Sequence, residues 1–385
     1  MKDKFLAHKY KENENNLMSE TANLKNKFED IIDLSLGGDP DIITDKSIIQ
    51  TAFKDTKKGY TRYSDPTGDK ELIEGIINFY KKDRNITFKV NEIMAVVGAC
   101  HGMYLALQSI LNSGEEVIVH SPYFTPYKEQ IEMVGGKFIE LETIEEDEFN
   151  INPNKLKKLI NNKTKAIVLN SPNNPTGAFS PPKKLLKEIA KIAIENDLVI
   201  ISDEVYDGFT YYEDFCSIAS LEGMKERTIT LGSFSKDFCM TGWRIGYVAA
   251  PDYIINTMKN INEGICFSAP TISQRAAIYA LKNRDNIVDK IKKEFKERME
   301  YAYNRIESIP KLSAFKPKAG IYIFVNIKET GKTSEEFCDD LLNKAHIVAI
   351  PGKAFGKYGE GYIRIACTVG LEELEQAFDR IKKIL

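Results

Sequence analysis

The chain has 385 residues, about twice the usual size of one domain, so two hydrophobic cores are expected. Its composition, 43% hydrophobic and 28% charged, is typical of ordinary soluble proteins and excludes disordered and collagen-like chains. A net charge of -3 provides no field that would attract nucleic acid or an anionic membrane, so small molecules are the expected ligands.

The sequence shows no targeting, membrane or metal-binding pattern. Residues 1–20 lack the apolar core of a signal peptide, and no stretch reaches the roughly 18 apolar residues of a membrane span. The six cysteines are scattered without a C-x-x-C pair, and the four histidines lack the spacing of metal ligands. These patterns predict a protein of the reducing cytoplasm that binds no metal.

Strand-like and helix-like segments alternate along the first part of the chain. Residues 1–45 contain no run long enough to form a sheet alone, and we expect them to pack on a small domain or a partner subunit. Over residues 46–280, amphipathic helices separate apolar runs rich in β-branched residues, at 93–97, 116–120, 137–142, 165–170, 198–202, 228–232 and 245–249. This alternation predicts an α/β domain whose helices cover the sheet.

The pattern changes after residue 280. A long charged helix is predicted over 284–308, followed by short strands at 321–327, 346–351 and 362–367 and by a final helix from Leu371. Residues 281–385 are therefore predicted to form a separate, smaller α+β domain.

The densest chemical signal is the segment GSFSKDFCMTGWRIGY, residues 232–247, which follows the predicted strand 228–232. Ser233, Ser235, Lys236 and Arg244 lie here among large apolar residues, and such polar groups become buried only with partners. A single lysine is usually an exposed surface residue. Hydroxyls and an arginine around one lysine can instead bind a phosphate dianion while the amine attacks an aldehyde.

This segment resembles the pyridoxal-phosphate (PLP) lysine motif of the class I/II aminotransferases, S-x-x-K followed by G-x-R-x-G. The resemblance implies that Lys236 carries the cofactor as a Schiff base and that Ser233 and Arg244 hold its phosphate. Cys239 departs from the family, which usually has a smaller or aliphatic residue there. The implied architecture is fold type I, a mostly parallel seven-stranded sheet with helices on both faces plus a smaller α+β domain.

Two further segments support this resemblance. Residues 174–177 read N-P-T-G, a common turn sequence, and Asn174 matches the family's asparagine at the cofactor ring hydroxyl and the substrate site. Asp203 follows the predicted strand 198–202, where a strand-end cap is the alternative interpretation. A carboxylate facing the pyridine nitrogen makes the ring an electron sink. The resemblance assigns that role to Asp203, and contact with the ring hydroxyl to Tyr206.

A strand-to-helix junction supplies the next part of the expected phosphate site. Gly98, Ala99 and Cys100 end one predicted strand and begin a helix, where free backbone N–H groups favour an anion. The family uses G-A-x here to bind the phosphate, and we expect these backbone contacts to be kept. His101 and Gly102 replace the family's usual Glu or Gln and Ala, so a side-chain role at these positions is not carried over.

The remaining site residues come from separate segments. By resemblance, Phe124 stacks on the cofactor ring, with Tyr123 as the alternative. Arg364 lies inside an apolar strand and needs an anion, for which the family's substrate α-carboxylate and a structural salt bridge are the two candidates. Residues 34–41 resemble a family loop that places Gly38 near the substrate. Tyr63 is the candidate to reach the phosphate of a neighbouring subunit in a homodimer, or is simply a surface aromatic.

The resemblance extends from residue 34 to the end of the chain. It implies an enzyme that transfers an amino group from an L-amino acid to a 2-oxo acid by a ping-pong mechanism. Another fold-type I PLP enzyme, such as a carbon–sulfur β-lyase, is the nearest alternative, although lyases often have a histidine where this chain reads D-E-V-Y. A PLP-binding transcription regulator is disfavoured because the N-terminal segment is short and not strongly basic. The sequence leaves the identity of the substrates open.

Overall fold

The structure is a computed structural model that describes residues 5–7, 21, 24, 27–36, 41–177 and 181–385. Seven strands within these residues form one large sheet, in the order β2-β8-β7-β6-β5-β3-β4. The strands are β2 (Ile93–Val96), β3 (Glu116–Ser121), β4 (Lys137–Glu142), β5 (Thr164–Asn170), β6 (Val199–Asp203), β7 (Thr228–Ser233) and β8 (Gly246–Ala249). Six of these strands run in the same direction and β8 runs in the opposite direction, so the predicted mostly parallel seven-stranded sheet is confirmed.

Helices cover both faces of the large sheet. On one face lie α4 (Gly98–Ile110), α5 (Pro126–Met133) and α8 (Asp252–Glu263); on the other lie α6 (Pro153–Leu159) and α7 (Lys183–Glu195). Successive strand residues alternate between the two cores: Val168 packs with the first set of helices and Ile167 with the second. A strand buried on both faces must be apolar throughout, which explains the continuous apolar runs in the sequence.

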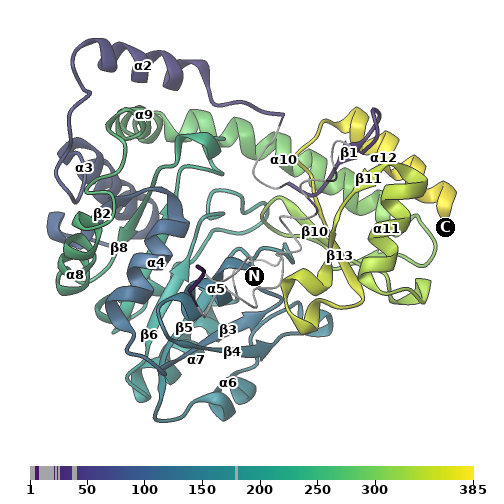
Figure 1. The fold of residues 1–385 in the computed structure, drawn as a ribbon, viewed down its shortest axis with the longest axis horizontal. Helices are drawn as coiled ribbons and strands as arrows, with labels where there is room; N and C mark the ends of the chain where they lie inside the picture. The colour runs from purple at the N-terminus through teal and green to yellow at the C-terminus, as the bar shows by residue number, and fades with distance from the viewer. Residues whose placement is uncertain (1–4, 8–20, 22–23, 25–26, 37–40, 178–180) are drawn as a thin grey trace.

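Three helices pack together beyond the β2 end of this sheet. They are α2 (Lys46–Lys57), α3 (Lys70–Phe79) and α9 (Thr271–Lys282), and α2 lies directly beside α9 (Figure 1). The long charged helix α10 (Arg284–Glu307) follows α9 and runs toward the C-terminal part of the chain. No described helix combines the length and apolar character that crossing a bilayer requires.

The C-terminal part contains a small antiparallel sheet in the order β12-β13-β10-β9. Its strands are β9 (Ser313–Ala314), β10 (Tyr322–Asn326), β12 (Ile350–Pro351) and β13 (Tyr362–Ala366), and α11 (Ser334–Ala345) and α12 (Leu371–Ile384) pack beside it (Figure 1). The division of the chain into domains at residues 45 and 280 stays a prediction.

One expected strand is in fact two. The run 346–351 was predicted as a single strand, but β11 (Ile347–Val348) pairs in parallel with β1 (Ile32–Asp33), whereas β12 pairs with β13. The run is divided at Ala349 because its two halves bond to strands of different sheets. Within the N-terminal segment, the described residues near β1 lie on this C-terminal part; the Phe28 ring stacks on His346 with centroids 4.0 Å apart.

Candidate active site

A cavity of about 270 Å³ lies at the carboxyl ends of β5, β6 and β7, where parallel α/β sheets bind their ligands. The N-terminus of α4 borders it on one side, and β10 and β13 of the small sheet border it on the other. Most of the residues predicted from the sequence line this cavity: Ala99, Cys100, Phe124, Asn174, Asp203, Tyr206, Ser233, Lys236, Arg244 and Arg364.

Lys236 follows the end of β7 and reaches the cavity from the large sheet. Its Nζ lies 5.8 Å from the centroid of the Tyr206 ring. Just before it, the backbone N–H of Ser235 donates to Ser233 Oγ at 3.1 Å, which fixes the turn that carries both hydroxyls. Amine and hydroxyls are thus held on one short, hydrogen-bonded segment.

Arg244 and the N-terminus of α4, which also border the cavity, supply a positive charge and backbone N–H groups. Arg244 has a left-handed backbone, with φ of 52°, and its Nη1 donates to the Thr241 carbonyl at 2.8 Å. Gly98 has φ of +76°, a backbone conformation that favours glycine, and a Cβ there would lie 2.6 Å from Arg244 Nη2. No described side chain caps the N-terminus of α4, so its first N–H groups remain available to an anion.

Asp203 ends β6 and is buried. The Tyr127 hydroxyl donates to its Oδ2 at 2.5 Å, and the backbone N–H of Val205 donates to Oδ1 at 3.3 Å. Burial raises the pKa of Asp203 to about 6, against the opposing effects of these hydrogen bonds and of the Lys236 charge. A buried carboxylate of this kind is stabilised by a cation, such as a protonated ring nitrogen.

Asn174 and Tyr206 lie beside Asp203 and are held by neighbouring polar groups. The backbone N–H of Asn174 donates to Asn170 Oδ1 at 2.9 Å, while Asn170 Nδ2 donates to the Asp203 carbonyl at 3.3 Å. The hydroxyl groups of Tyr206 and Tyr322 are hydrogen-bonded at 2.9 Å. The amide and the two phenols therefore form an ordered wall of the cavity.

Arg364, on β13, is only 1% exposed although its side chain is charged. Its guanidinium carbon lies 4.5 Å from the Tyr322 ring centroid and 5.0 Å from that of Phe355. Nη1 donates to Asn174 Oδ1 at 3.0 Å and Nη2 donates to the Ser35 carbonyl, both neutral acceptors. Nε has no hydrogen-bond partner among the described residues, and burial lowers the pKa of Arg364. A carboxylate would supply the missing negative charge.

Two of the described positions that the sequence predicted do not line the cavity. Gly98 lies behind it, against Arg244. Tyr63 is 83% exposed and contacts Phe267, with ring centroids 5.2 Å apart. Gly38 lies outside the described residues. Of the two aromatic candidates for stacking, Phe124 lines the cavity, whereas Tyr123 is buried against Phe138.

The residues of this site that sequence reasoning missed include Tyr127, Asn170 and Tyr322. Tyr127 lies within the same SPYFTPY segment that supplied Phe124, and Asn170 is the polar end of an apolar strand. Tyr322 begins an apolar strand that pairs with β13. A polar group on a buried strand was the signal that identified Arg364, and a weaker signal of the same kind was present at Tyr322 and Asn170.

These residues fit PLP group by group. Two serine hydroxyls, Arg244 and the α4 N-terminus suit a phosphate dianion, and Asp203 suits a protonated ring nitrogen. Asn174 and Tyr206 suit a ring hydroxyl, and Lys236 is the amine that an aldehyde requires.

Comparison with known proteins agrees with this fit. The family model of the class I and II aminotransferases matches residues 29–381. The chain belongs to this family. An aspartate aminotransferase of Pyrococcus abyssi is 43% identical over 362 residues, covering 93% of this chain and 92% of the relative. An aromatic-amino-acid aminotransferase of Thermococcus litoralis is 40% identical, covering 93% and 92%.

Solved structures of the family have the same fold. The aromatic aminotransferase of Pyrococcus horikoshii superposes with a TM-score of 0.90 at 41% identity, over 95% of this chain and 98% of that chain. The protein is accordingly a PLP-dependent aminotransferase of fold type I, as the sequence resemblance implied.

Proposed function

We propose that this aminotransferase moves an amino group from an L-amino acid to a 2-oxo acid at the cavity described above, with Lys236 as the residue that binds PLP covalently. The observation that supports this most directly is the presence of Lys236, Asp203 and Arg364 on the walls of one cavity. An amine, a buried carboxylate and a buried guanidinium are the groups that the cofactor's aldehyde, its ring nitrogen and the substrate's carboxylate each require.

PLP, when bound, supplies the aldehyde for the amino group and a ring that accepts the electrons of the substrate's Cα–H bond. Asp203 would hold the proton of the ring nitrogen, and Tyr206 and Asn174 would hold the ring hydroxyl. The Lys236 amine, once free, would take a proton from the substrate α-carbon as a general base and return it to the reacting carbon framework as a general acid.

Arg364 gives the site its selectivity for amino acids. Its guanidinium already has its position fixed by Asn174, Ser35 and the flanking rings, so a bidentate bond to a carboxylate requires little reorganisation. An amino acid and the corresponding 2-oxo acid carry the same α-carboxylate. Both half-reactions can therefore use one site in turn, which is the basis for a ping-pong mechanism.

We also propose a cytoplasmic homodimer with shared active sites. Tyr63, Ile265 and Phe267 expose 83%, 51% and 38% of their surfaces, and Tyr63 and Phe267 are in contact. Exposed apolar groups that cluster mark an interaction surface. A second copy of the chain on this surface would bury them and bring Tyr63 to the phosphate region of the partner. The six cysteines, all within the described residues, form no disulfide, as suits a reducing compartment.

A panel of amino acids, each added to the PLP-loaded enzyme without a 2-oxo acid, tests the proposed reaction. Substrates should convert bound PLP to its amine form in one turnover, seen by absorbance, and adding a 2-oxo acid should restore the original spectrum. Simple amines without a carboxylate serve as controls. Continuous release of ammonia without a 2-oxo acid would instead indicate elimination, the reaction of the lyase alternative.

A further inference from the structure

The loop that carries Tyr63 is held in place by contacts with another part of the chain. Residues 58–69, all of which the structure describes, form no helix or strand between α2 and α3. Tyr63 is 83% exposed, so its own side chain does not anchor the loop. A segment without regular hydrogen bonding loses conformational freedom when it adopts a single conformation, and contacts elsewhere must compensate.

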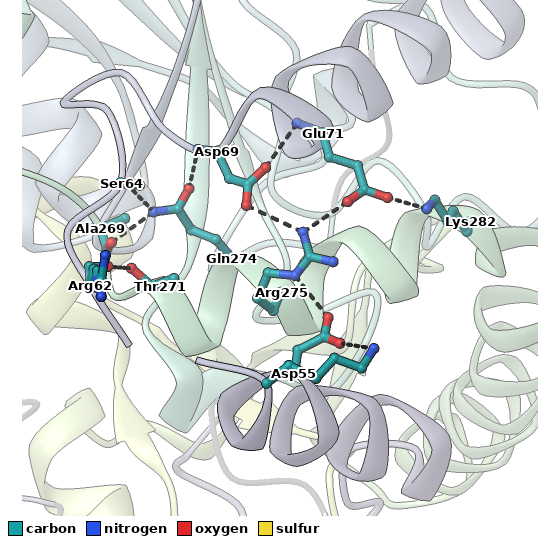
Figure 2. Close-up of polar contacts among 11 residues, drawn as sticks. Asp55, Arg62, Ser64, Asp69, Glu71, Ala269, Thr271, Gln274, Arg275 and Lys282 are labelled. Carbon is teal, nitrogen blue, oxygen red and sulfur yellow. Dashed lines mark hydrogen bonds and ion pairs between the residues drawn. The ribbon is translucent and has the colours of Figure 1, made fainter. Parts of the chain in front are cut away.

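Helix α9 provides these contacts from one face. Figure 2 shows Thr271, Gln274 and Arg275 pointing from α9 toward the loop and its flanks. Residues three and four positions apart lie on the same side of a helix. The Thr271 hydroxyl donates to the Arg62 carbonyl at 2.6 Å, one residue before Tyr63.

Arg275 holds the two ends of the loop. Its Nε donates to Asp55 Oδ2 at 2.8 Å, within α2, and its Nη1 donates to Asp69 Oδ2 at 3.3 Å and Glu71 Oε2 at 2.8 Å, at the start of α3. Its guanidinium carbon also lies 4.3 Å from the centroid of the Tyr60 ring. The helices on either side of the loop are therefore tied to the same α9 side chain (Figure 2).

Gln274 holds the middle of the loop and is fully buried. Its Oε1 accepts from the Asp69 backbone N–H at 2.6 Å, and its Nε2 donates to Ser64 Oγ at 2.9 Å and to the Ala269 carbonyl at 2.8 Å. A buried amide with these partners specifies one conformation, because any displacement of the loop would leave a polar group unpaired. Ser64 directly follows Tyr63.

The loop backbone also passes unusually close to Gln274. Gly68 has φ of +121°, and a Cβ there would lie 3.2 Å from Gln274 Oε1 and 2.8 Å from the Ala95 Cβ. Only glycine combines this backbone conformation with this approach. The sequence of the loop is thus adapted to the position of the amide.

We propose that Gln274 is a positioning residue that acts across the dimer: it holds the loop of its own subunit in the conformation from which Tyr63 reaches the cofactor phosphate of the partner subunit. This inference rests on the shared active site proposed above. Gln274 does not line the active-site cavity. It affects cofactor binding through Tyr63, in the active site of the partner subunit.

The first test is a double-mutant cycle on cofactor affinity. Gln274→Met keeps the length of the side chain and loses its hydrogen bonds to Asp69, Ser64 and Ala269, and the dissociation constant of PLP should rise roughly tenfold. Once Tyr63→Ala has removed the group being positioned, adding Gln274→Met should cause no further loss. An unchanged dissociation constant in Gln274→Met, or losses that multiply in the double variant, would overturn the inference.

Two further variants accompany the cycle. Thr228→Val removes another buried hydrogen bond, from Thr228 Oγ1 to the Met224 carbonyl at 2.7 Å, and should leave PLP affinity unchanged. Ser64→Ala removes the Gln274 contact from the loop side, and replaces Gln274→Met in the cycle if that protein does not fold.

The second test uses hybrid dimers, isolated with two affinity tags and assayed for bound PLP and for activity at low PLP concentration. A Lys236→Ala subunit is paired in turn with Tyr63→Ala, Gln274→Met and Asp203→Asn subunits. If Gln274 acts across the interface, the hybrids with Tyr63→Ala and Gln274→Met each keep one intact site, and about half of the wild-type activity per dimer. The Asp203→Asn hybrid should have none, because each of its sites has a defect.

The outcomes distinguish the role of Gln274 from the existence of a shared active site. Recovery with Tyr63→Ala but not with Gln274→Met would refute the role of Gln274 and leave the shared site standing. Recovery with neither would refute the shared site, and with it the inference. Recovery with both, at similar levels, is the expected result.

Discussion

The hydroxyl oxygens of Tyr206 and Tyr322 lie 2.9 Å apart in the wall of the active-site cavity, and the ring of Tyr322 also stacks on the Arg364 guanidinium at 4.5 Å. Although burial opposes it, the Lys236 and Arg364 charges lower the pKa of Tyr322. One side chain thus connects the residue proposed to hold the cofactor's ring hydroxyl with the residue proposed to bind the substrate.

The two contacts of Tyr322 can be separated by mutation. Tyr322→Phe removes the hydroxyl and keeps the ring, so Tyr206 should donate less strongly to the cofactor, and the pKa read from the absorbance of bound PLP should rise by about half a unit. Tyr322→Leu also removes the stacking on Arg364, and only this variant should raise KM for amino acids. An equal rise in KM for both variants would contradict the separate roles.

Asp203 should make cofactor binding depend on pH. With a pKa of about 6, the carboxyl group of the PLP-free enzyme takes up a proton as the pH falls below 6 and can no longer pair with a protonated ring nitrogen. PLP affinity should therefore fall between pH 7.5 and pH 5 in the wild type, and this part of the pH dependence should be absent from Asp203→Asn. That variant should also lose most activity while remaining folded. Identical pH profiles in the two proteins would exclude the role given to Asp203.

Arg364→Lys keeps the charge and loses the planar fork. The KM for amino acids should rise roughly 10- to 100-fold, because a bidentate charged hydrogen bond is lost, while the reaction with simple amines should change little. Steady-state kinetics with a matched amino acid and amine give both values. Equal losses for the two substrates would show that Arg364 is structural.

Glu204 should make the free energy of unfolding depend on pH, with a less stable fold at higher pH. Burial raises its pKa to about 7, although Ser217 and Ser202 donate hydrogen bonds to it. An ordinary glutamate in the unfolded chain has a pKa of about 4.3, so the folded protein binds the proton more tightly. The stabilisation from this group is complete below about pH 4 and is lost as the pH rises through about 7.

Glu204→Gln removes this dependence. Relative to the wild type, the free energy of unfolding of the variant should increase by roughly 2 to 3 kcal/mol between pH 5 and pH 8, measured by chemical denaturation. Glu188→Gln, at an exposed position of α7, is the control and should show no such trend. A parallel response of wild type and Glu204→Gln would mean that Glu204 stays ionised in the fold.

The elements of the large sheet could be predicted from the sequence because all of its strands except the edge strand β4 are mostly buried on both faces. Burial on both faces produces a continuous apolar run, and each of the seven runs became a strand. The short strands β11 and β12 could not be separated in advance. Their division at Ala349 depends on β1 and β13, which lie far away in the sequence.

The site was predictable where a residue carries a charge in an apolar context, as at Lys236 and Arg364. Tyr127 and Tyr322 gave a weaker signal, because a tyrosine in an apolar segment is most often a core residue. Their contacts to Asp203 and Tyr206 join segments 76 and 116 residues apart. No local pattern specifies such pairs. The hydrogen bonds by which Gln274 anchors the loop could likewise not be predicted from the sequence, since its partners Ser64 and Asp69 lie more than 200 residues away.

Chemical trapping can identify the lysine that binds PLP, which we propose is Lys236. The PLP-loaded enzyme is reduced with borohydride and digested, and the modified peptide is identified by mass spectrometry. We expect one reduced cofactor adduct, on Lys236, and no adduct at that position in a Lys236→Ala protein treated in parallel. An adduct on a different lysine of the wild-type protein, or no adduct at all, would contradict this proposal.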